Sequence, residues 1–354
     1  MTCRGFILQK EDDLEYTSFL EKTGMKSSSV LGYHFPFYRS MLEEIGVGTP
    51  MYIGLRDQND NLVAILPGFI KHGDLGTVYS SLPFFGPNAG ILVSPEINQP
   101  ELVYQHIFNY LFEQLGKFNM LSASIYTPFN HSELLSFYRQ FSKPSIVIDK
   151  FTSYIKLEHL SVNKKLEYDI RKALKMGVTL RTSIRDEADI QAIFQIYRKN
   201  CEDYGIPVKP RECIQFLLEQ STESKNIGIY LAEYENKIIG ALIMIYSPTV
   251  ASYYLPCSLH EYRSYQPVSF LIHHAFRDAM SRSIKIWNWE SSPSKESGVF
   301  KFKQKWGSEE GEYKIFVYPY RDQQFFKNTG QQNIEASYPY YFVYPFSLIS
   351  DDHA

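Results

Sequence analysis

Residues 284–307 gather the side chains in this sequence that could transfer a group between charged substrates. Aromatic and β-branched residues alternate with others over 284–290, which predicts a strand ending at Glu290. A loop rich in Ser and Pro follows, and after it come three closely spaced lysines: Lys301, Lys303 and Lys305. A carboxylate can accept a proton and a cation can stabilise an oxyanion, so Glu290 is a candidate base. The alternative is that Glu290 and these lysines form solvated surface.

The composition narrows the class of protein. A chain of 354 residues is long enough for two domains with sizeable cores. Hydrophobic residues make up 44% and charged residues 21%, values that indicate a folded globular chain. The formal net charge of -3 argues against a protein that coats nucleic acid, and we expect no DNA partner. The four cysteines show no paired spacing, so we expect neither a metal site nor a disulfide framework.

The N-terminal residues point to a cellular location. The first dozen residues are charged and lack the apolar core of a signal peptide. No apolar run approaches the roughly 20 residues that a helix needs to span a bilayer. These features predict a cytoplasmic protein, and they are compatible with peripheral contact with a membrane.

The same order of elements occurs twice, which indicates an internal repeat. In the first half, a hairpin over 52–66 precedes a strand near 77–81, a helix over 99–116 and a strand over 121–126. In the second half, a hairpin over 229–246 precedes a strand at 250–255, a helix at 268–281 and the strand at 284–290. Domain boundaries follow from this order. We predict a first domain over 1–155, a second over 156–320 that carries the catalytic groove, and an aromatic-rich tail over 321–354.

A hairpin followed by a strand–helix–strand unit is typical of α+β architecture. We therefore predict two domains, each with a mixed, largely antiparallel sheet flanked by helices. This order resembles the GCN5-related N-acetyltransferase (GNAT) fold. Residues 298–307, which contain Phe302-Lys303 followed by Trp306-Gly307, resemble the closing signature of the Fem-type transferases. These are tandem GNAT-fold enzymes that add amino acids to peptidoglycan precursors. Further weak motifs match that family in order: residues 81–84, 168–173 with 177–178, and 204–207.

The resemblance assigns roles to individual residues. It implies that Lys303, together with Phe302, helps to stabilise the reaction centre, which adds both to Glu290 as predicted catalytic residues. It also implies that basic residues bind a nucleotide-sugar or lipid-linked sugar acceptor. Arg suits a diphosphate because its fork donates two parallel hydrogen bonds. The candidates in or beside the matching motifs are Arg171, Lys209 and Arg211, with Arg39 as a fainter one in the first domain. The alternative for each is an exposed surface cation.

The acyl donor is the part that the sequence leaves open. Enzymes that use acetyl-coenzyme A normally carry a Gly-rich loop that cradles the diphosphate at a helix N-terminus. Arg263, a further candidate substrate-binding residue, stands where that pattern would begin, but both glycines are missing and Pro267 has no N–H to donate. Fem-type enzymes use aminoacyl-tRNA instead, although no basic stripe for tRNA is evident. We expect no tightly bound cofactor and either aminoacyl-tRNA or acyl-coenzyme A as co-substrate.

Three functions are compatible with these observations. The first is an acyltransferase that moves an aminoacyl or acyl group to an amine of a peptidoglycan-type or amino-sugar precursor of the cell envelope. The second is an acyl-coenzyme A-dependent amino-sugar N-acyltransferase of surface polysaccharide synthesis. The third is a non-catalytic protein that binds glycan precursors. For the tail, we expect an extended segment that buries aromatic rings against a domain, and the alternative is docking of a partner.

Overall fold

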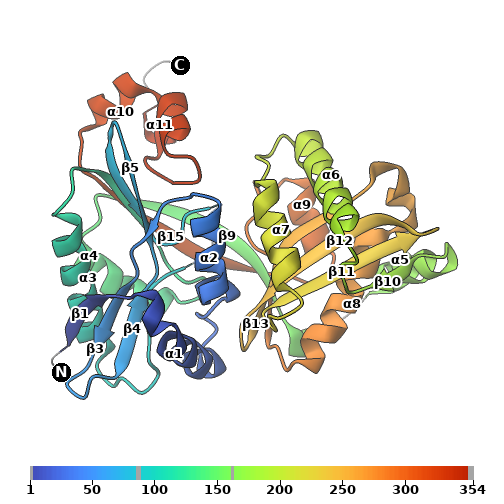
Figure 1. The fold of residues 1–354 in the computed structure, drawn as a ribbon, viewed down its shortest axis with the longest axis horizontal. Coiled ribbons are helices and arrows are strands. Elements are labelled where there is room, and N and C mark those ends of the chain that lie inside the picture. Colours follow the sequence, from blue (N-terminus) through green and yellow to red (C-terminus); the bar gives the residue numbers. More distant parts are fainter. Residues whose placement is uncertain (1–2, 85–88, 161–162, 350–354) are drawn as a thin grey trace. The chain divides into compact units, whose positions relative to one another are not determined.

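The computed structural model describes residues 3–84, 89–160 and 163–349, and the chain passes twice between two units (Figure 1). Unit 1 contains residues 1–151 and 311–354, and unit 2 contains residues 152–310. Two strands, β9 (Ile146–Lys156) and β15 (Glu309–Pro319), carry the chain from one unit to the other. The first crossing lies close to the predicted boundary at 155.

The C-terminal part of the chain differs from the predicted division. Residues from Gly311 onward, which we assigned to the second domain up to 320 and then to a separate tail, cluster with unit 1. The reason is strand pairing: β15 lies antiparallel to β8 (Met120–Tyr126), with Phe316 opposite Ile125. This pairing could not be read from local sequence, because nearly two hundred residues separate the partners.

Unit 1 contains a four-stranded antiparallel sheet and a second group of five strands, which includes a parallel strand–helix–strand unit. Four strands form an antiparallel sheet in the order β1-β3-β4-β7. Five more follow the order β15-β8-β6-β5-β2, in which β6 and β8 are parallel and α3 connects them. The bounds are β1 (Arg4–Ile7), α1 (Asp13–Lys26), α2 (Pro36–Glu44), β2 (Thr49–Pro50), β3 (Ile53–Arg56), β4 (Leu62–Leu66), β5 (Phe69–Gly73), β6 (Gly76–Ser80), β7 (Leu92–Val93), α3 (Pro100–Leu115), α4 (Leu135–Ser142), α10 (Gln323–Thr329) and α11 (Gln331–Ser337).

Unit 2 repeats the parallel strand–helix–strand unit. Its strands follow the order β10-β11-β12-β13-β14-β9, in which β13 and β14 are parallel and α8 connects them. The bounds are α5 (Lys164–Lys175), β10 (Thr179–Arg181), α6 (Glu187–Tyr204), α7 (Arg211–Gln220), β11 (Ile227–Tyr234), β12 (Lys237–Tyr246), β13 (Val250–Ser258), α8 (Pro267–Ser281), β14 (Ile286–Asn288) and α9 (Gly298–Gln304). The units β6-α3-β8 and β13-α8-β14 thus correspond, and the predicted α+β class with mixed, largely antiparallel sheets is confirmed.

Each unit has its own hydrophobic core. In unit 2, nearly every residue of β11 and β12 is buried, because α8 and α5 pack on one side and α6 and α7 contact the same strands (Figure 1). Large aromatic rings fill the end of this core near β14, and the ring centroids of Phe276 and Trp287 lie 4.1 Å apart. Within the described residues, every helix is too short or too polar to cross a lipid bilayer.

One histidine of unit 1 is buried where a positive charge would be poorly solvated. His34 is fully buried, and the backbone N–H of Leu31 donates to its Nδ1 at 2.9 Å. The carbonyl oxygen of Leu31 also lies 3.1 Å from Nδ1, whereas Nε2 has no hydrogen-bond partner among the described residues. Burial lowers the pKa of His34 to about 4. A protonated imidazolium in this position would carry a desolvated charge.

We predict that stability falls as the pH is lowered from about 6.5 to 4. In this window the unfolded chain protonates His34 and the folded chain does not, so the unfolded state binds more protons. The loss amounts to about 3 kcal/mol at pH 4. Urea unfolding between pH 7 and pH 4 should show a shallower pH dependence in His34→Gln. The half-buried His106→Gln serves as the control, and equal slopes in both variants would contradict the prediction.

Candidate active site

Helix α9 carries the predicted Phe302-Lys303 pair, in which Phe302 packs against aromatic rings and Lys303 forms hydrogen bonds. The ring centroid of Phe302 lies 6.5 Å from that of Trp289 and 6.4 Å from that of Trp306. This edge-on packing fixes α9 against the aromatic core of unit 2. As a result, Lys303 faces inward, toward the loop that follows β14. The structure thus places Phe302 in a packing position from which it orients its neighbour.

The ammonium group of Lys303 is buried and fully engaged. Its side chain is 3% exposed, and Nζ donates to Glu290 O at 2.9 Å, to Ser291 O at 2.8 Å and to Ser292 Oγ at 3.0 Å. An ammonium has three N–H donors, so these contacts use all of them. Burial lowers the pKa of Lys303 to about 8, and the charge of Glu290 opposes this shift. Lys303 therefore holds the Glu290–Ser292 backbone and provides positive charge there.

Glu290 is held by a buried amide. Asn288, fully buried, donates from Nδ2 to Glu290 Oε1 at 2.7 Å, and its Oδ1 accepts the backbone N–H of Glu290 at 3.0 Å. Each end of the amide thus contacts a different part of the same residue. Glu290 has a φ of 60°, a left-handed conformation that costs an L-residue roughly 1–2 kcal/mol. Strain of this kind persists where surrounding contacts enforce it, and such positions cluster at functional sites.

The residues around Asn288 lie where two parallel strands separate. β13 pairs with β14 over three positions, and Ser252 opposite Asn288 is the last. β13 continues to Ser258 in its pairing with β12, whereas β14 ends and the chain turns away at Glu290. Asn288 Nδ2 also donates to Ser252 Oγ at 3.4 Å, and Thr152 Oγ1 donates to Asn288 Oδ1 at 3.3 Å. A polar network therefore occupies the point at which the parallel ladder stops.

Lys209 is a second cation of this region. It lies in the loop between α6 and α7, where its backbone N–H donates to Tyr197 Oη at 3.2 Å. Its Nζ lies 5.2 Å from the centroid of the Tyr254 ring, in reach of a cation–π contact. Burial lowers the pKa of Lys209 to about 8, while nearby thiols and Glu290 act in the opposite direction. Lys303 thus contacts Glu290 directly, whereas Lys209 is held in a separate loop by Tyr197 and Tyr254.

Two other predicted cations of unit 2 pair with carboxylates, and only one of them is exposed. Arg171, with a side chain 65% exposed, faces Glu167 one turn earlier on α5 at 3.7 Å. Arg211 begins α7, pairs with Glu187 and donates from Nη1 to Gln215 Oε1 at 2.7 Å. The exposed Arg171 pair contributes little to stability and leaves that cation accessible, whereas Arg211 is half-buried and also donates from Nε to Gln191 Oε1 at 3.3 Å. Neither arginine contacts Glu290 or Lys303.

The remaining two predicted cations have other surroundings. Arg263 precedes α8, and its guanidinium lies 5.6 Å from the ring centroid of Tyr204 and donates to its hydroxyl at 3.2 Å. Arg39 belongs to the interior of unit 1, where it is 2% exposed. Its Nη2 donates to both carboxylate oxygens of Asp13 at 2.7 Å, and the guanidinium lies 5.6 Å from the ring centroid of Tyr52. Arg39 is therefore neutralised within its own unit.

Sequence reasoning missed Asn288, which we counted only as one position of a strand. A signal was present: Asn288 and Glu290 stand two residues apart, and such residues point to the same face of an extended chain. An amide between two tryptophans in a strand that is otherwise fit for burial is also unusual, because a buried amide needs partners. Neither signal identifies those partners, which come from β9 and β13.

We predict that Asn288→Ala destabilises unit 2 by about 1–3 kcal/mol, because Thr152 and Ser252 lose a buried partner and the backbone of Glu290 loses its acceptor. Thr152→Val removes a single 3.3 Å bond and should cost less. Chemical unfolding followed by tryptophan fluorescence reports on this unit, since it contains all three tryptophans. The reverse ranking of the two variants would show that the network does not fix Glu290.

Comparison with known proteins identifies the type of domain. Residues 161–287 match the acetyltransferase (GNAT) domain family. No curated protein matches the sequence significantly. Among solved structures, FemX is 11% identical with a TM-score of 0.64, over 89% of this chain and 97% of that one. A tandem GNAT protein from the clavulanic acid biosynthesis pathway is 8% identical with a TM-score of 0.50, over 91% of this chain and 100% of that one.

A third similar structure is the C-terminal domain of a putative lysylphosphatidylglycerol synthetase from Agrobacterium fabrum. It is 12% identical with a TM-score of 0.52, over 86% of this chain and 91% of that one. At such identities the likeness concerns the fold. The chain has the Fem-like tandem GNAT fold, as the sequence predicted, and unit 2 contains a GNAT-type acyltransferase domain.

Proposed function

We propose that this tandem GNAT-fold chain transfers an aminoacyl or acyl group to an amine of a cell-envelope precursor. The supporting observation is that Lys303 and Asn288 hold Glu290 at the point where β13 and β14 separate, within the unit that matches the acetyltransferase family. A carboxylate held by a buried amide, with an ammonium group on its own backbone segment, suits a reaction in which an amine loses a proton while a carbonyl gains negative charge.

The proposed reaction is a direct transfer. The amine nitrogen of the acceptor attacks the carbonyl carbon of the donor, and a C–N bond forms. The C–O bond of an ester donor, or the C–S bond of a thioester, then breaks. Glu290 accepts the proton that the attacking nitrogen loses, and this proton leaves with the departing oxygen or sulfur. No covalent bond to the protein is needed, so the main tasks of the site are alignment and charge stabilisation.

The two lysines have separate roles in this proposal. Lys303 uses its three donors on the Glu290–Ser292 segment, so it acts by positioning that segment and by its positive field. Lys209 comes from a different loop and is held at its backbone by Tyr197. We assign to Lys209 the contact with the anionic part of a substrate. Arg171, on the surface of the same unit, is available for more distant parts of a large acceptor, and the half-buried Arg211 would have to exchange its present partners to bind one.

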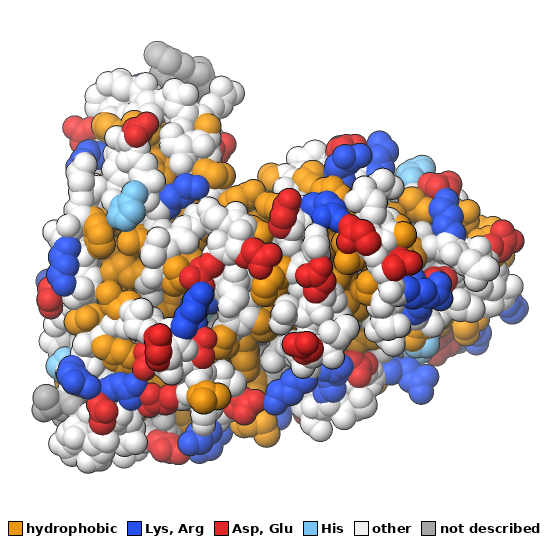
Figure 2. Space-filling model, in the orientation of Figure 1, with side chains coloured by type: hydrophobic (Ala, Val, Ile, Leu, Met, Phe, Trp, Pro, Cys, Tyr) orange, Lys and Arg blue, Asp and Glu red, His pale blue; other side chains and the backbone are white. Residues whose placement is uncertain are grey.

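The residues at the start of α8 disfavour the usual mode of coenzyme A binding. The start of α8, where a GNAT domain would cradle a diphosphate, has Gln266 in a left-handed conformation with φ of 59° and Pro267 as the first helical residue. Pro267 donates no N–H, and a Gly-rich turn is missing. An aminoacyl ester of tRNA fits this departure. On the face shown in Figure 2, however, basic and acidic side chains are interspersed, so tRNA would find only local basic contacts there.

The test compares donors directly. The full chain is incubated with aminoacyl-tRNA or with acyl-coenzyme A, together with an amino-sugar or peptidoglycan-type acceptor, and new amide products are measured by mass spectrometry. Amide formation from aminoacyl-tRNA supports the proposal. Clear calorimetric binding of acetyl-coenzyme A with transfer from it supports the polysaccharide N-acyltransferase instead. Acceptor binding with no transfer from either donor supports the non-catalytic glycan-binding protein. Mass spectrometry of copurified molecules narrows the choice of acceptor.

A further inference from the structure

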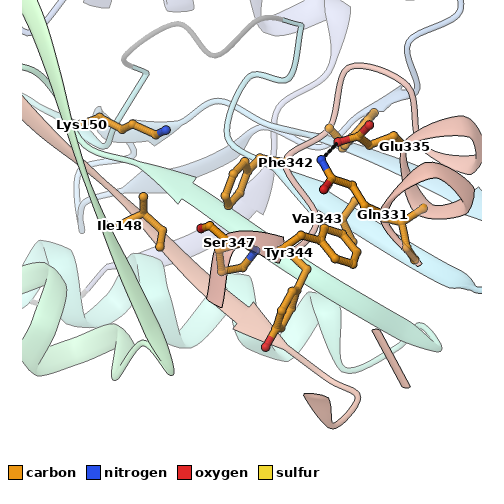
Figure 3. A pocket seen from close by; sticks show the side chains of 12 residues that line it. Ile148, Lys150, Gln331, Glu335, Phe342, Val343, Tyr344 and Ser347 are labelled. Carbon is orange, nitrogen blue, oxygen red and sulfur yellow. Dashed lines mark hydrogen bonds between the residues drawn. The ribbon is translucent and has the colours of Figure 1, made fainter. Parts of the chain in front are cut away.

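Unit 1 contains a pocket of about 410 Å³ that uses no residue of the Glu290 site (Figure 3). It lies between the unit 1 end of β9, helix α11 and the C-terminal residues 341–347. Figure 3 shows the ring of Phe342 between Lys150 on one side and the Gln331–Glu335 pair on the other. A volume of this size falls within the range that small-molecule sites occupy.

The floor of the pocket is fixed to the core of unit 1. Ser122 Oγ donates to Val343 O at 2.6 Å. The ring of Tyr344 stacks on that of Phe326, with centroids 4.1 Å apart and planes 16° from parallel. Tyr338 Oη donates to Gly76 O at 2.8 Å, which anchors the start of the segment. The C-terminal segment thus buries aromatic rings as the sequence predicted, although helices α10 and α11 precede it. The pocket is preformed, so a ligand would not have to order it.

The lining has an apolar floor and a polar rim. Ile334, Val343 and Tyr344 are buried, whereas the ring of Phe342 is only partly covered. At the rim, Gln331 Nε2 donates to Glu335 Oε1 at 2.7 Å, which orients the carboxylate. Opposite these residues stands Lys150, which has no carboxylate partner among the described residues. The rim therefore offers donors and acceptors around an aromatic surface.

The charges of the rim limit the class of ligand. One ammonium and one carboxylate face the same space, so a nucleoside diphosphate or another polyanion would meet as much repulsion as attraction. A long hydrocarbon chain would leave these charged groups without partners. The lining instead suits a compact neutral molecule with one apolar face and a polar edge. A pyranose ring has this character, because its axial C–H bonds form an apolar face and its hydroxyls surround it as donors and acceptors.

We propose that this pocket binds a saccharide unit, with the sugar face against Phe342 and the hydroxyls bonded to Lys150, Gln331 and Glu335. The binding function is separate from acyl transfer and does not depend on the proposed reaction. For a glycan acceptor or a growing envelope polymer, it would hold a sugar outside the catalytic unit.

The experiment uses the full chain and the disaccharide of β-1,4-linked N-acetylglucosamine. Saturation-transfer NMR detects contact of sugar protons with aromatic rings, and calorimetry gives the affinity. We expect binding in the millimolar range that Phe342→Ala weakens about tenfold or more. Phe325→Ala removes a similarly half-buried ring from α10, which does not line the pocket, and should bind as the unchanged protein does.

Further measurements distinguish sugar binding in this pocket from the proposed acyl transfer. Glu290→Gln should leave disaccharide binding unchanged, and Phe342→Ala should leave transfer to a small amine unchanged. Uridine diphosphate and octanoate are titrated as the competing ligand classes. The proposal is overturned by three results: no detectable disaccharide binding, equal binding by Phe342→Ala, or Phe342-dependent binding of either competitor in place of the sugar.

Discussion

Replacing Glu290 with glutamine is expected to lower kcat for acyl transfer by about 10²- to 10⁴-fold near neutral pH, the usual contribution of a general base. Glutamine has nearly the same shape, and its amide oxygen can still accept the hydrogen bond from Asn288 Nδ2. Its backbone contacts with Asn288 and Lys303 stay in place. The variant therefore removes the proton acceptor while it preserves the local structure.

The matched control for this variant is Glu296→Gln, which neutralises an exposed carboxylate in the same loop. Both variants should unfold within about 1 kcal/mol of the unchanged protein, because neither changes buried volume. A second measurement varies the acceptor amine: amines of lower pKa hold their proton less tightly, so the deficit of Glu290→Gln should shrink with them. A rate within twofold of the control, with every amine, would remove Glu290 from the role of base.

The fold could be predicted because its signals are local. Hairpin turns and the alternation of apolar residues placed the strands at 52–66 and 229–246, and helical spacing placed the helices before the last strand of each half. The parallel pairs β6–β8 and β13–β14 follow from those orders, because a helix connects each pair. The crossing of β15 into unit 1 was missed, since pairing between distant segments has no local pattern.

The role of the candidate site stays a prediction, and only part of its geometry could be anticipated from local sequence. Residue types and a short motif pointed to Glu290 and Lys303, and the structure joins the two through the hydrogen bond from Lys303 Nζ to Glu290 O. The sequence did not indicate whether each side chain is buried or which partners it contacts. Lys303 is buried because the ring of Phe302 packs against Trp289 and Trp306. The hydrogen bonds of Asn288 that hold Glu290 depend on the position of β14 between β13 and β9. Tertiary packing determines these contacts. The sequence alone therefore does not distinguish an exposed lysine from a buried lysine whose three N–H groups are all hydrogen-bonded.

Replacing Lys303 with methionine is expected to destabilise unit 2 by about 2–4 kcal/mol and to reduce transfer together with stability. Methionine fills much of the same space, but it leaves the carbonyl oxygens of Glu290 and Ser291 without their donor. Removal of the buried charge offsets part of this loss, which is why the expected cost is below that of breaking a buried ion pair. Lys301→Met and Lys305→Met, at exposed positions beside it, should stay within about 0.5 kcal/mol.

The pH dependence gives this prediction a second, independent measurement. Lys303 has a pKa of about 8 in the folded protein and about 10.5 when unfolded, so above pH 8 the unfolded state binds more protons and stability rises with pH. Lys209 contributes in the same direction with its own pKa of about 8. Lys303→Met should therefore reduce the rise between pH 8 and 9.5 by about half, leaving the part due to Lys209. In the unchanged protein, transfer should decline over the same interval, because the ammonium charges beside Glu290 are lost. If Lys303→Met matches Lys301→Met in both stability and pH slope, then the three contacts of Nζ do not hold the site together.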